Sequence, residues 1–264
     1  MFMGLRTAQL ISLALVVVGI CKKPTLQAYD ELQRAYDHFN NELFDGVLPD
    51  CLITLQREKQ TYGYFSPERF VNSQGTRTDE IAMNPAYFAV CPPEEIMQTL
   101  CHEMCHLWQH HFGKPGRRGY HNKEWADFME AIGLMPSSTG APGGARTGDK
   151  MADYAIEGGR FLEAYESLMT DDYRISWMDR FPSREKLMAA IANGTTDEMA
   201  GDLSIMGLAG ISVEDGEITF EPGERPNKSN REKYTCPLCQ ANIWGKPGLN
   251  VLCGDCDTAF EAAN

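Results

Sequence analysis

Apolar residues recur at intervals of three or four in three stretches of the chain, the spacing of amphipathic α-helices. In residues 28–44 the apolar positions are Tyr29, Leu32, Tyr36, Phe39 and Leu43. A second helix is predicted to begin at residues 92–95, because early prolines and glutamates suit a helix start. Its apolar positions are Ile96, Leu100, Met104, Leu107 and Trp108. A third helix is predicted over residues 122–132.

Between the first two predicted helices lie short stretches rich in β-branched and aromatic residues, which favour a small β-sheet. These stretches are residues 51–56, 63–65 and 80–83. Helices combined with a small sheet predict an α+β domain over residues 24–136.

The rest of the chain divides by composition into an extension, a tether and a small terminal module. Glycine, proline and serine in residues 136–150 predict a loop or linker. Residues 137–220 are predicted to form an extension without assigned chemistry, with helices over 151–169 and 184–193 and a hairpin at 214–216. We expect a polar tether over 221–233 and a separate module over 234–264.

Composition indicates a chain with folded domains and excludes a strongly basic protein. With 43% hydrophobic and 23% charged residues among 264, the chain has enough apolar surface for folded domains. The formal charge of −13 excludes the diffuse positive field of a histone-like protein, so any nucleic-acid contact requires a local basic patch.

The first 23 residues form an apolar leader whose role the sequence alone leaves open. The apolar run at residues 10–20 is shorter than the roughly 20 residues that span a bilayer, and no small-x-small cleavage pattern follows it. A weak export or anchoring segment and a non-native leader ahead of Pro24 both remain open. Nine unevenly placed cysteines suit a reducing compartment, so we expect a cytoplasmic protein without a stable membrane span.

The second predicted helix carries an H-E-x-x-H motif from His102 to His106. On a helix, positions i and i+4 share one face, so both imidazoles converge on a single Zn²⁺ while Glu103 lies beside a water-bearing position. Zinc activates water and polarises a carbonyl, and Glu103 is expected to act as the general base in peptide hydrolysis.

A catalytic zinc needs a third protein ligand, and two residues offer it. His121 and Glu124 lie at the start of the third predicted helix, and spacing alone does not decide between them. His110 and His111 are expected to be solvated or to interact with the helix end. Cys101 and Cys105 are expected to be small buried thiols.

The terminal module carries two C-x-x-C pairs separated by thirteen residues, close to zinc-ribbon spacing. Four thiolates fill a zinc tetrahedron, so the predicted site is structural, and the metal supplies folding free energy that so short a module lacks. The predicted ligands are Cys236, Cys239, Cys253 and Cys256.

Residues 100–106 (LCHEMCH), 119–125 (GYHNKEW) and 132–134 (IGL) resemble the SprT-like metalloprotease domain, whose eukaryotic relative is Spartan. The resemblance covers about residues 26–136, and the terminal ribbon extends it, whereas residues 137–222 depart from the minimal family pattern. It implies that His102, His106 and His121 bind the catalytic zinc and that Glu103 is the base. It also implies proteolysis of proteins crosslinked to DNA.

We therefore expect a zincin-like α+β metallopeptidase domain followed by a zinc ribbon, with one catalytic and one structural Zn²⁺ and a protein or peptide substrate. The alternative is a non-catalytic, zinc-stabilised DNA-binding or adaptor protein of the same fold.

Two groups of basic residues raise the question of DNA contact. Near the ribbon they are interleaved with Tyr234 and Trp244, which offer a stacking face for single strands. The basic residues are Arg225, Lys228, Arg231, Lys233 and Lys246, and, near the H-E-x-x-H motif, Lys114, Arg117, Arg118 and Lys123. Acidic residues lie close to the ribbon, so DNA contact and solvated tether charges stand as equal interpretations.

Overall fold

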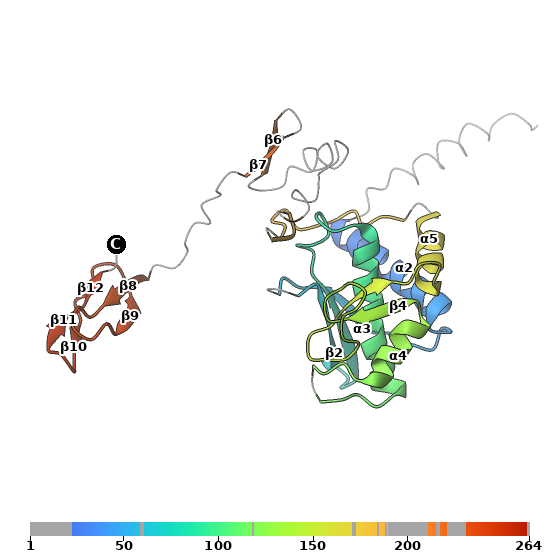
Figure 1. The fold of residues 1–264 in the computed structure, drawn as a ribbon, viewed down its shortest axis with the longest axis horizontal. Helices are drawn as coiled ribbons and strands as arrows, with labels where there is room; N and C mark the ends of the chain where they lie inside the picture. The colour runs from blue at the N-terminus through green and yellow to red at the C-terminus, as the bar shows by residue number, and fades with distance from the viewer. Residues whose placement is uncertain are drawn as a thin grey trace, which may run out of the picture. The chain divides into compact units, whose positions relative to one another are not determined.

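The computed structural model describes residues 23–58, 61–117, 119–170, 173–183, 185–187, 189, 211–214, 217–220 and 231–262, with side chains of 211–214 and 217–220 left aside. The apolar leader and most of the predicted tether lie outside these residues. The chain forms two compact units, residues 1–209 with 213–218 and residues 210–212 with 219–264 (Figure 1). Among the described residues, no helix combines the length and apolar character that crossing a membrane requires.

The first helix that the structure describes in the large unit is α2 (Pro24–Leu43), which starts four residues before the predicted helix because Pro24 suits a first helical turn. Its buried face includes Leu32, Tyr36 and Phe39, as the periodicity predicts. Tyr29, which the pattern also assigns to the apolar face, is 40% exposed.

A three-stranded sheet follows, with the order β1-β3-β2. Strands β1 (Leu52–Leu55), β2 (Gly63–Val71) and β3 (Arg77–Met83) confirm the three predicted strands, and the last two are longer than predicted. β1 is parallel to β3, whereas β2 is antiparallel and lies at the edge, with an irregular register between Ser66 and Phe70. The central position of β3 accounts for its run of buried residues.

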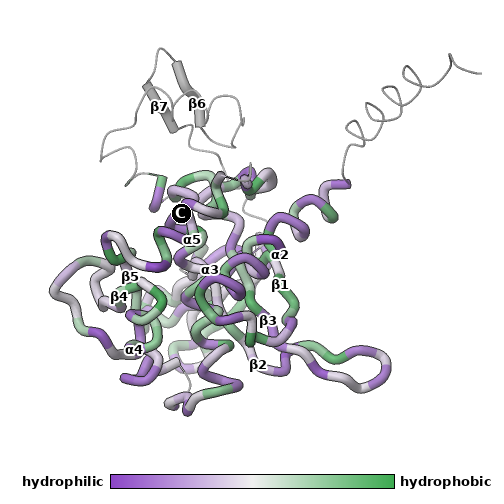
Figure 2. The backbone as a smooth tube through the Cα atoms, turned by 90° about the vertical axis from the view of Figure 1, so that its right-hand side faces the viewer, coloured by the Kyte–Doolittle hydropathy of each residue, from purple (hydrophilic) through white to green (hydrophobic). Residues whose placement is uncertain are grey.

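Helix α3 (Pro93–Phe112) carries the H-E-x-x-H motif and contacts the sheet, α2 and the next helix, α4 (Figure 1). It is buried on more than one face: Leu100, Met104 and Leu107 are fully buried, and so are Cys101 and Cys105, as expected for small buried thiols. In Figure 2 hydrophobic stretches gather around β1, β3 and α3. The motif therefore lies on an element that the core holds from several sides.

Beyond α4 (Lys123–Ala131), β4 (Leu134–Ser137) pairs antiparallel with β5 (Ala152–Ala155), and α5 (Arg160–Thr170) follows. The predicted linker at 136–150 thus joins two paired strands. The prediction of one helix over 151–169 was wrong, because β5 and a turn at Gly158 and Gly159 precede α5. Phe161 of α5 packs on Phe39 with ring centroids 5.9 Å apart, so this part of the predicted extension belongs to the same hydrophobic core.

Strands β6 (Ile211–Glu214) and β7 (Glu217–Phe220) pair on either side of the predicted hairpin at 214–216, of which residues 215 and 216 lie outside the described residues. Residues 185–187 are helical, and much of the helix predicted over 184–193 lies outside the described residues.

The small unit contains two sheets of short strands, β12-β8-β9 and β10-β11. The strands are β8 (Glu232–Thr235), β9 (Asn242–Gly245), β10 (Leu252–Cys253), β11 (Thr258–Ala259) and β12 (Glu261–Ala262). Tyr234 is buried, and its hydroxyl donates to the Lys246 carbonyl at 2.7 Å and accepts from the Leu249 N–H at 3.0 Å. Because β8 begins at Glu232, the end of the predicted tether is part of this sheet.

Candidate metal centres

Three imidazoles converge in the large unit. His102 and His106 lie one turn apart on α3, with ring centroids 5.1 Å apart. His121, which precedes α4, lies 5.4 Å from His102 and 4.8 Å from His106 between ring centroids. One ring nitrogen from each of the three lies within 4.8 Å of the others. We call these residues the histidine cluster.

Trp125 of α4 packs against all three imidazoles. Its ring is stacked on His106 at 5.1 Å with an interplanar angle of 18°, and it meets His102 and His121 edge-on at 4.8 and 4.5 Å. Trp125 is fully buried. A rigid buried ring in this position restricts the rotamers of the histidines, which keeps their nitrogens convergent.

The backbone holds His121 in place through the loop that follows β4. The His121 N–H donates to the Gly148 carbonyl at 2.8 Å, and the Gly148 N–H donates back to the His121 carbonyl at 3.2 Å. The Nδ1 of His121 is 3.1 Å from the same Gly148 oxygen, so Nδ1 carries the proton and donates. The Nε2 atom is then free to bind a metal.

Glu124, the alternative third ligand, serves another network. Its Oε2 accepts from the Lys114 N–H at 2.6 Å and from Gln109 Nε2 at 2.8 Å. The Lys114 N–H and then Gln109 lower the pKa of Glu124. Gln109 also donates to Asn122, which caps α4 by accepting from the Trp125 N–H. The structure thus groups His121, and not Glu124, with the two helix histidines.

Asp153 of β5 is a residue of this site that sequence reasoning missed. Its Oδ2 is 2.9 Å from His102 Nδ1, and its Oδ1 accepts from Gln98 Nε2 at 3.2 Å. The side chain of Asp153 is 8% exposed. A carboxylate on one nitrogen of an imidazole orients the other toward a metal, as is typical of metal-binding histidines. No spacing rule points to a residue 51 positions from His102.

Glu103 is buried beside the cluster and is 7% exposed. Burial raises the pKa of its carboxyl to about 7; the charge of His102 opposes this rise and that of Asp153 adds to it. The Phe65 backbone N–H donates to the carboxylate from the edge strand. Strand β2 approaches α3 closely at Gly63, where a Cβ would lie 3.0 Å from Thr99 Cγ2 and 3.5 Å from Glu103 Cγ. Without a bound metal ion, Glu103 therefore gains and loses its proton near neutral pH.

The environment also sets the charge of the histidines. Burial, followed by the charge of His102, lowers the pKa of His106 well below its ordinary value and that of His121 to about 4. For His102, burial lowers the pKa, but the hydrogen bond to Asp153 and the charge of Glu103 outweigh it, so the net change is upward. His106 and His121 are neutral at physiological pH, the state that binds a metal.

His110 and His111 lie outside this cluster. Both are exposed at the end of α3, but His111 Nε2 is 2.7 Å from Oδ2 of Asp79 on β3. His111 is therefore not merely solvated, because it pairs with a carboxylate of the sheet.

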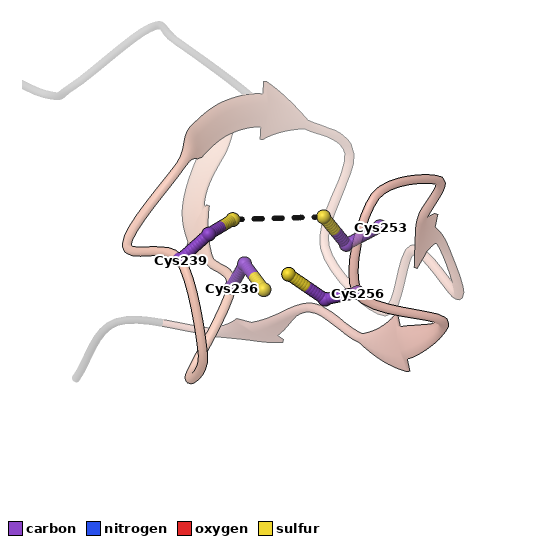
Figure 3. Close-up of side chains that lie close together, drawn as sticks. All are labelled: Cys236, Cys239, Cys253 and Cys256. Carbon is purple, nitrogen blue, oxygen red and sulfur yellow. Dashed lines mark hydrogen bonds between the residues drawn. The ribbon is translucent and has the colours of Figure 1, made fainter.

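The small unit brings its four predicted cysteines together (Figure 3). The sulfurs of Cys236, Cys239, Cys253 and Cys256 lie within 4.8 Å of one another, and all four are free thiols. Figure 3 shows them converging from two turns that face each other. The Cys239 N–H, followed by that of Leu238, lowers the pKa of Cys236 to about 7. Four converging thiols fit a tetrahedral structural metal site such as that of zinc.

Comparison with known proteins agrees with the resemblance that the motifs indicate. Residues 32–143, which include the whole histidine cluster and Glu103, match the SprT-like family. A curated relative from Salmonella typhimurium, an uncharacterized protein in the mucB 3′ region, is 64% identical over 59 residues, which are 22% of this chain and 80% of that protein. No solved structure matches the chain. The resemblance predicted from the motifs is thus confirmed: the chain belongs to the SprT-like family.

Proposed function

We propose that this protein is a zinc-dependent metallopeptidase with a zincin-like active site in the large unit. The observation that carries the proposal is the convergence of His102, His106 and His121, with ring nitrogens within 4.8 Å of one another, beside the buried Glu103. Membership of the SprT-like family supports it.

The residues present fit a catalytic zinc. Three imidazoles provide three of the four positions of a tetrahedral ion, which is the ligand number of catalytic rather than structural zinc sites. Asp153 on His102 and the Gly148 carbonyl on His121 supply the outer hydrogen bonds that such ligands need. When bound, zinc polarises a substrate carbonyl and lowers the pKa of water toward about 7.

Glu103 is the proposed general base. A carboxylate beside the metal position can take a proton from an attacking water and return it to the leaving amine. The Phe65 N–H holds the carboxylate from β2 while the α3 backbone fixes its Cα. The position of Glu103 between His102 and His106 on α3 supports a carboxylate next to the metal position.

We further propose that the small unit contacts single-stranded nucleic acid, which would direct the peptidase to substrates on DNA. Trp244 of β9 is 62% exposed and lies directly opposite Lys233 of β8, on one face of the sheet. An exposed indole beside an ammonium group suits base stacking and a phosphate contact. Tyr234, the other expected stacking residue, is buried and supplies none of this surface.

Metal dependence tests the peptidase proposal. Purified protein is assayed on an unfolded protein substrate such as casein before and after removal of metal with a chelator, and again after addition of Zn²⁺. We expect cleavage to disappear with the metal and to return with zinc. Cleavage that survives metal removal, or zinc-loaded protein without turnover, would contradict the proposal, and the second result would favour a binding or adaptor role.

A further inference from the structure

A second group of possible metal ligands lies where the end of α3 meets the sheet. It consists of Asp79 on β3 and of His110 and His111 in the last turn of α3. One oxygen or nitrogen from each of the three lies within 4.8 Å of the others. We call these residues the Asp79 cluster.

Asp79 is placed to serve as a ligand. Its side chain is only 7% exposed, and Oδ1 accepts from the Glu68 N–H at 2.7 Å, where the register of β2 is irregular. The other oxygen, Oδ2, points at His111 Nε2. A buried carboxylate with one oxygen held by the backbone presents the second oxygen in a fixed direction.

Two imidazoles converge on this carboxylate, although a hydrogen bond needs only one. The rings of His110 and His111 lie 4.9 Å apart between centroids. His110 also lies against the Phe65 ring at 5.8 Å, and within the described part of the chain no hydrogen bond is made by its imidazole. Both histidines are exposed, so their rings can rotate to close the remaining distance around an ion.

We propose that Asp79, His110 and His111 form a second divalent-cation site, suited to Zn²⁺. Two imidazoles and a carboxylate are a donor set that zinc accepts, and water completes the coordination because the site is open. The bound ion would link the last turn of α3 to β3.

This site is separate from the histidine cluster. His110 follows His106 by four residues, so it lies about 6 Å further along the same helix face. The two groups share no ligand, and Asp79 comes from β3, so an ion bound here would be distinct from an ion bound by the histidine cluster. The proposal therefore adds an ion outside the reaction centre and does not depend on peptidase activity.

Zinc stoichiometry tests the proposal on the full-length chain. Protein is titrated with Zn²⁺ against a chromophoric chelator, and we expect the wild type to take up one equivalent more than the variants Asp79→Asn and His110→Gln. His38→Gln is the matched control, because His38 lies on α2 and bonds the Ala164 carbonyl, and it should keep the wild-type uptake. His110→Gln changes an exposed side chain and remains informative if Asp79→Asn does not fold. Equal uptake by wild type and His110→Gln would overturn the proposal.

A second measurement uses the unmodified chain. With ¹⁵N-labelled histidine, the last equivalent of Zn²⁺ should shift the ring nitrogen signals of His110 and His111 and leave that of His38 in place. Signals of His110 and His111 that do not respond to this equivalent would overturn the proposal. Failure of the peptidase assay would leave both measurements unaffected.

Discussion

Replacement of Glu103 by glutamine tests the proposed reaction most directly. Glutamine has nearly the same shape, and its side-chain oxygen can still accept from the Phe65 N–H, so the local packing is retained. The three imidazoles are unchanged, so the variant should bind zinc like the wild type. What it loses is a group that can take up a proton. Removal of a general base lowers the rate by about 10²–10⁴-fold, which is about 3–5 kcal/mol in the activation barrier.

The assay compares kcat for cleavage of an unfolded protein by zinc-loaded Glu103→Gln and wild type, with zinc content measured on the same samples. Glu94→Gln is the matched control, since Glu94 lies in the first turn of α3, away from the cluster, and should retain wild-type activity. Normal cleavage by zinc-loaded Glu103→Gln would refute the assignment of the base. Loss of zinc together with activity would refute the reasoning that glutamine preserves the site.

The same substitution should raise the stability of the metal-free protein at high pH. In the folded chain burial raises the pKa of Glu103 from 4.5 to about 7, so between these values the folded state holds more protons than the unfolded state. Stability of the wild type therefore falls as pH rises through this window, by roughly 3 kcal/mol in total. Glutamine does not ionise. Urea unfolding in the presence of a chelator should give similar free energies of unfolding for wild type and Glu103→Gln near pH 4.5, and a higher value for the variant at pH 8. A difference that does not change with pH would contradict the role assigned to Glu103.

Four further results are expected. His121→Ala should release the zinc of the histidine cluster while Glu124→Ala retains it, because of these two residues only His121 belongs to that cluster; equal zinc content of the two variants in metal analysis would contradict this. Asp153→Asn should weaken zinc binding about 10–100-fold in a competition titration, because it changes the group that orients His102; unchanged affinity would count against that role. Chelation should unfold the small unit and leave the large unit folded, as measured by hydrogen exchange. Simultaneous loss of amide protection in both units would contradict a metal-independent core in the large unit. Trp244→Ala should cost about 1–3 kcal/mol in single-stranded DNA binding measured by anisotropy; an unchanged affinity would remove the indole from the contact.

The parts of the site that local rules govern could be predicted from the sequence. His102 and His106 lie one turn apart on a helix, so their spacing alone places them on one face. The cysteine pairs are local in the same sense, since each C-x-x-C forms a tight turn. The hydrophobic spacing of α2 likewise predicted most of its buried face.

The parts that depend on tertiary contacts could not be predicted. His121 precedes the capping residue of α4, so helical periodicity does not fix its direction, and its contact with Gly148 decides that it faces the cluster. Asp153 was hidden by the incorrect helix over residues 151–169. Gly158 and Gly159 inside that stretch were the available signal, because glycine costs about 1 kcal/mol in a helix interior relative to alanine.

The histidine cluster and the four-cysteine site differ in how much folding depends on a metal ion, because the residues around them differ. In the large unit Trp125, Leu100 and Phe161 are fully buried members of one extended core, which stabilises the fold independently of an ion. In the small unit the buried hydrophobic residues are Tyr234 and two of the cysteines themselves, among the residues that the structure describes. A zinc ion bound by the four cysteines of the small unit would therefore supply folding free energy, and it would use all four coordination positions. In the large unit the core orients the histidines without metal, so a zinc ion held there can keep a position open for water and substrate.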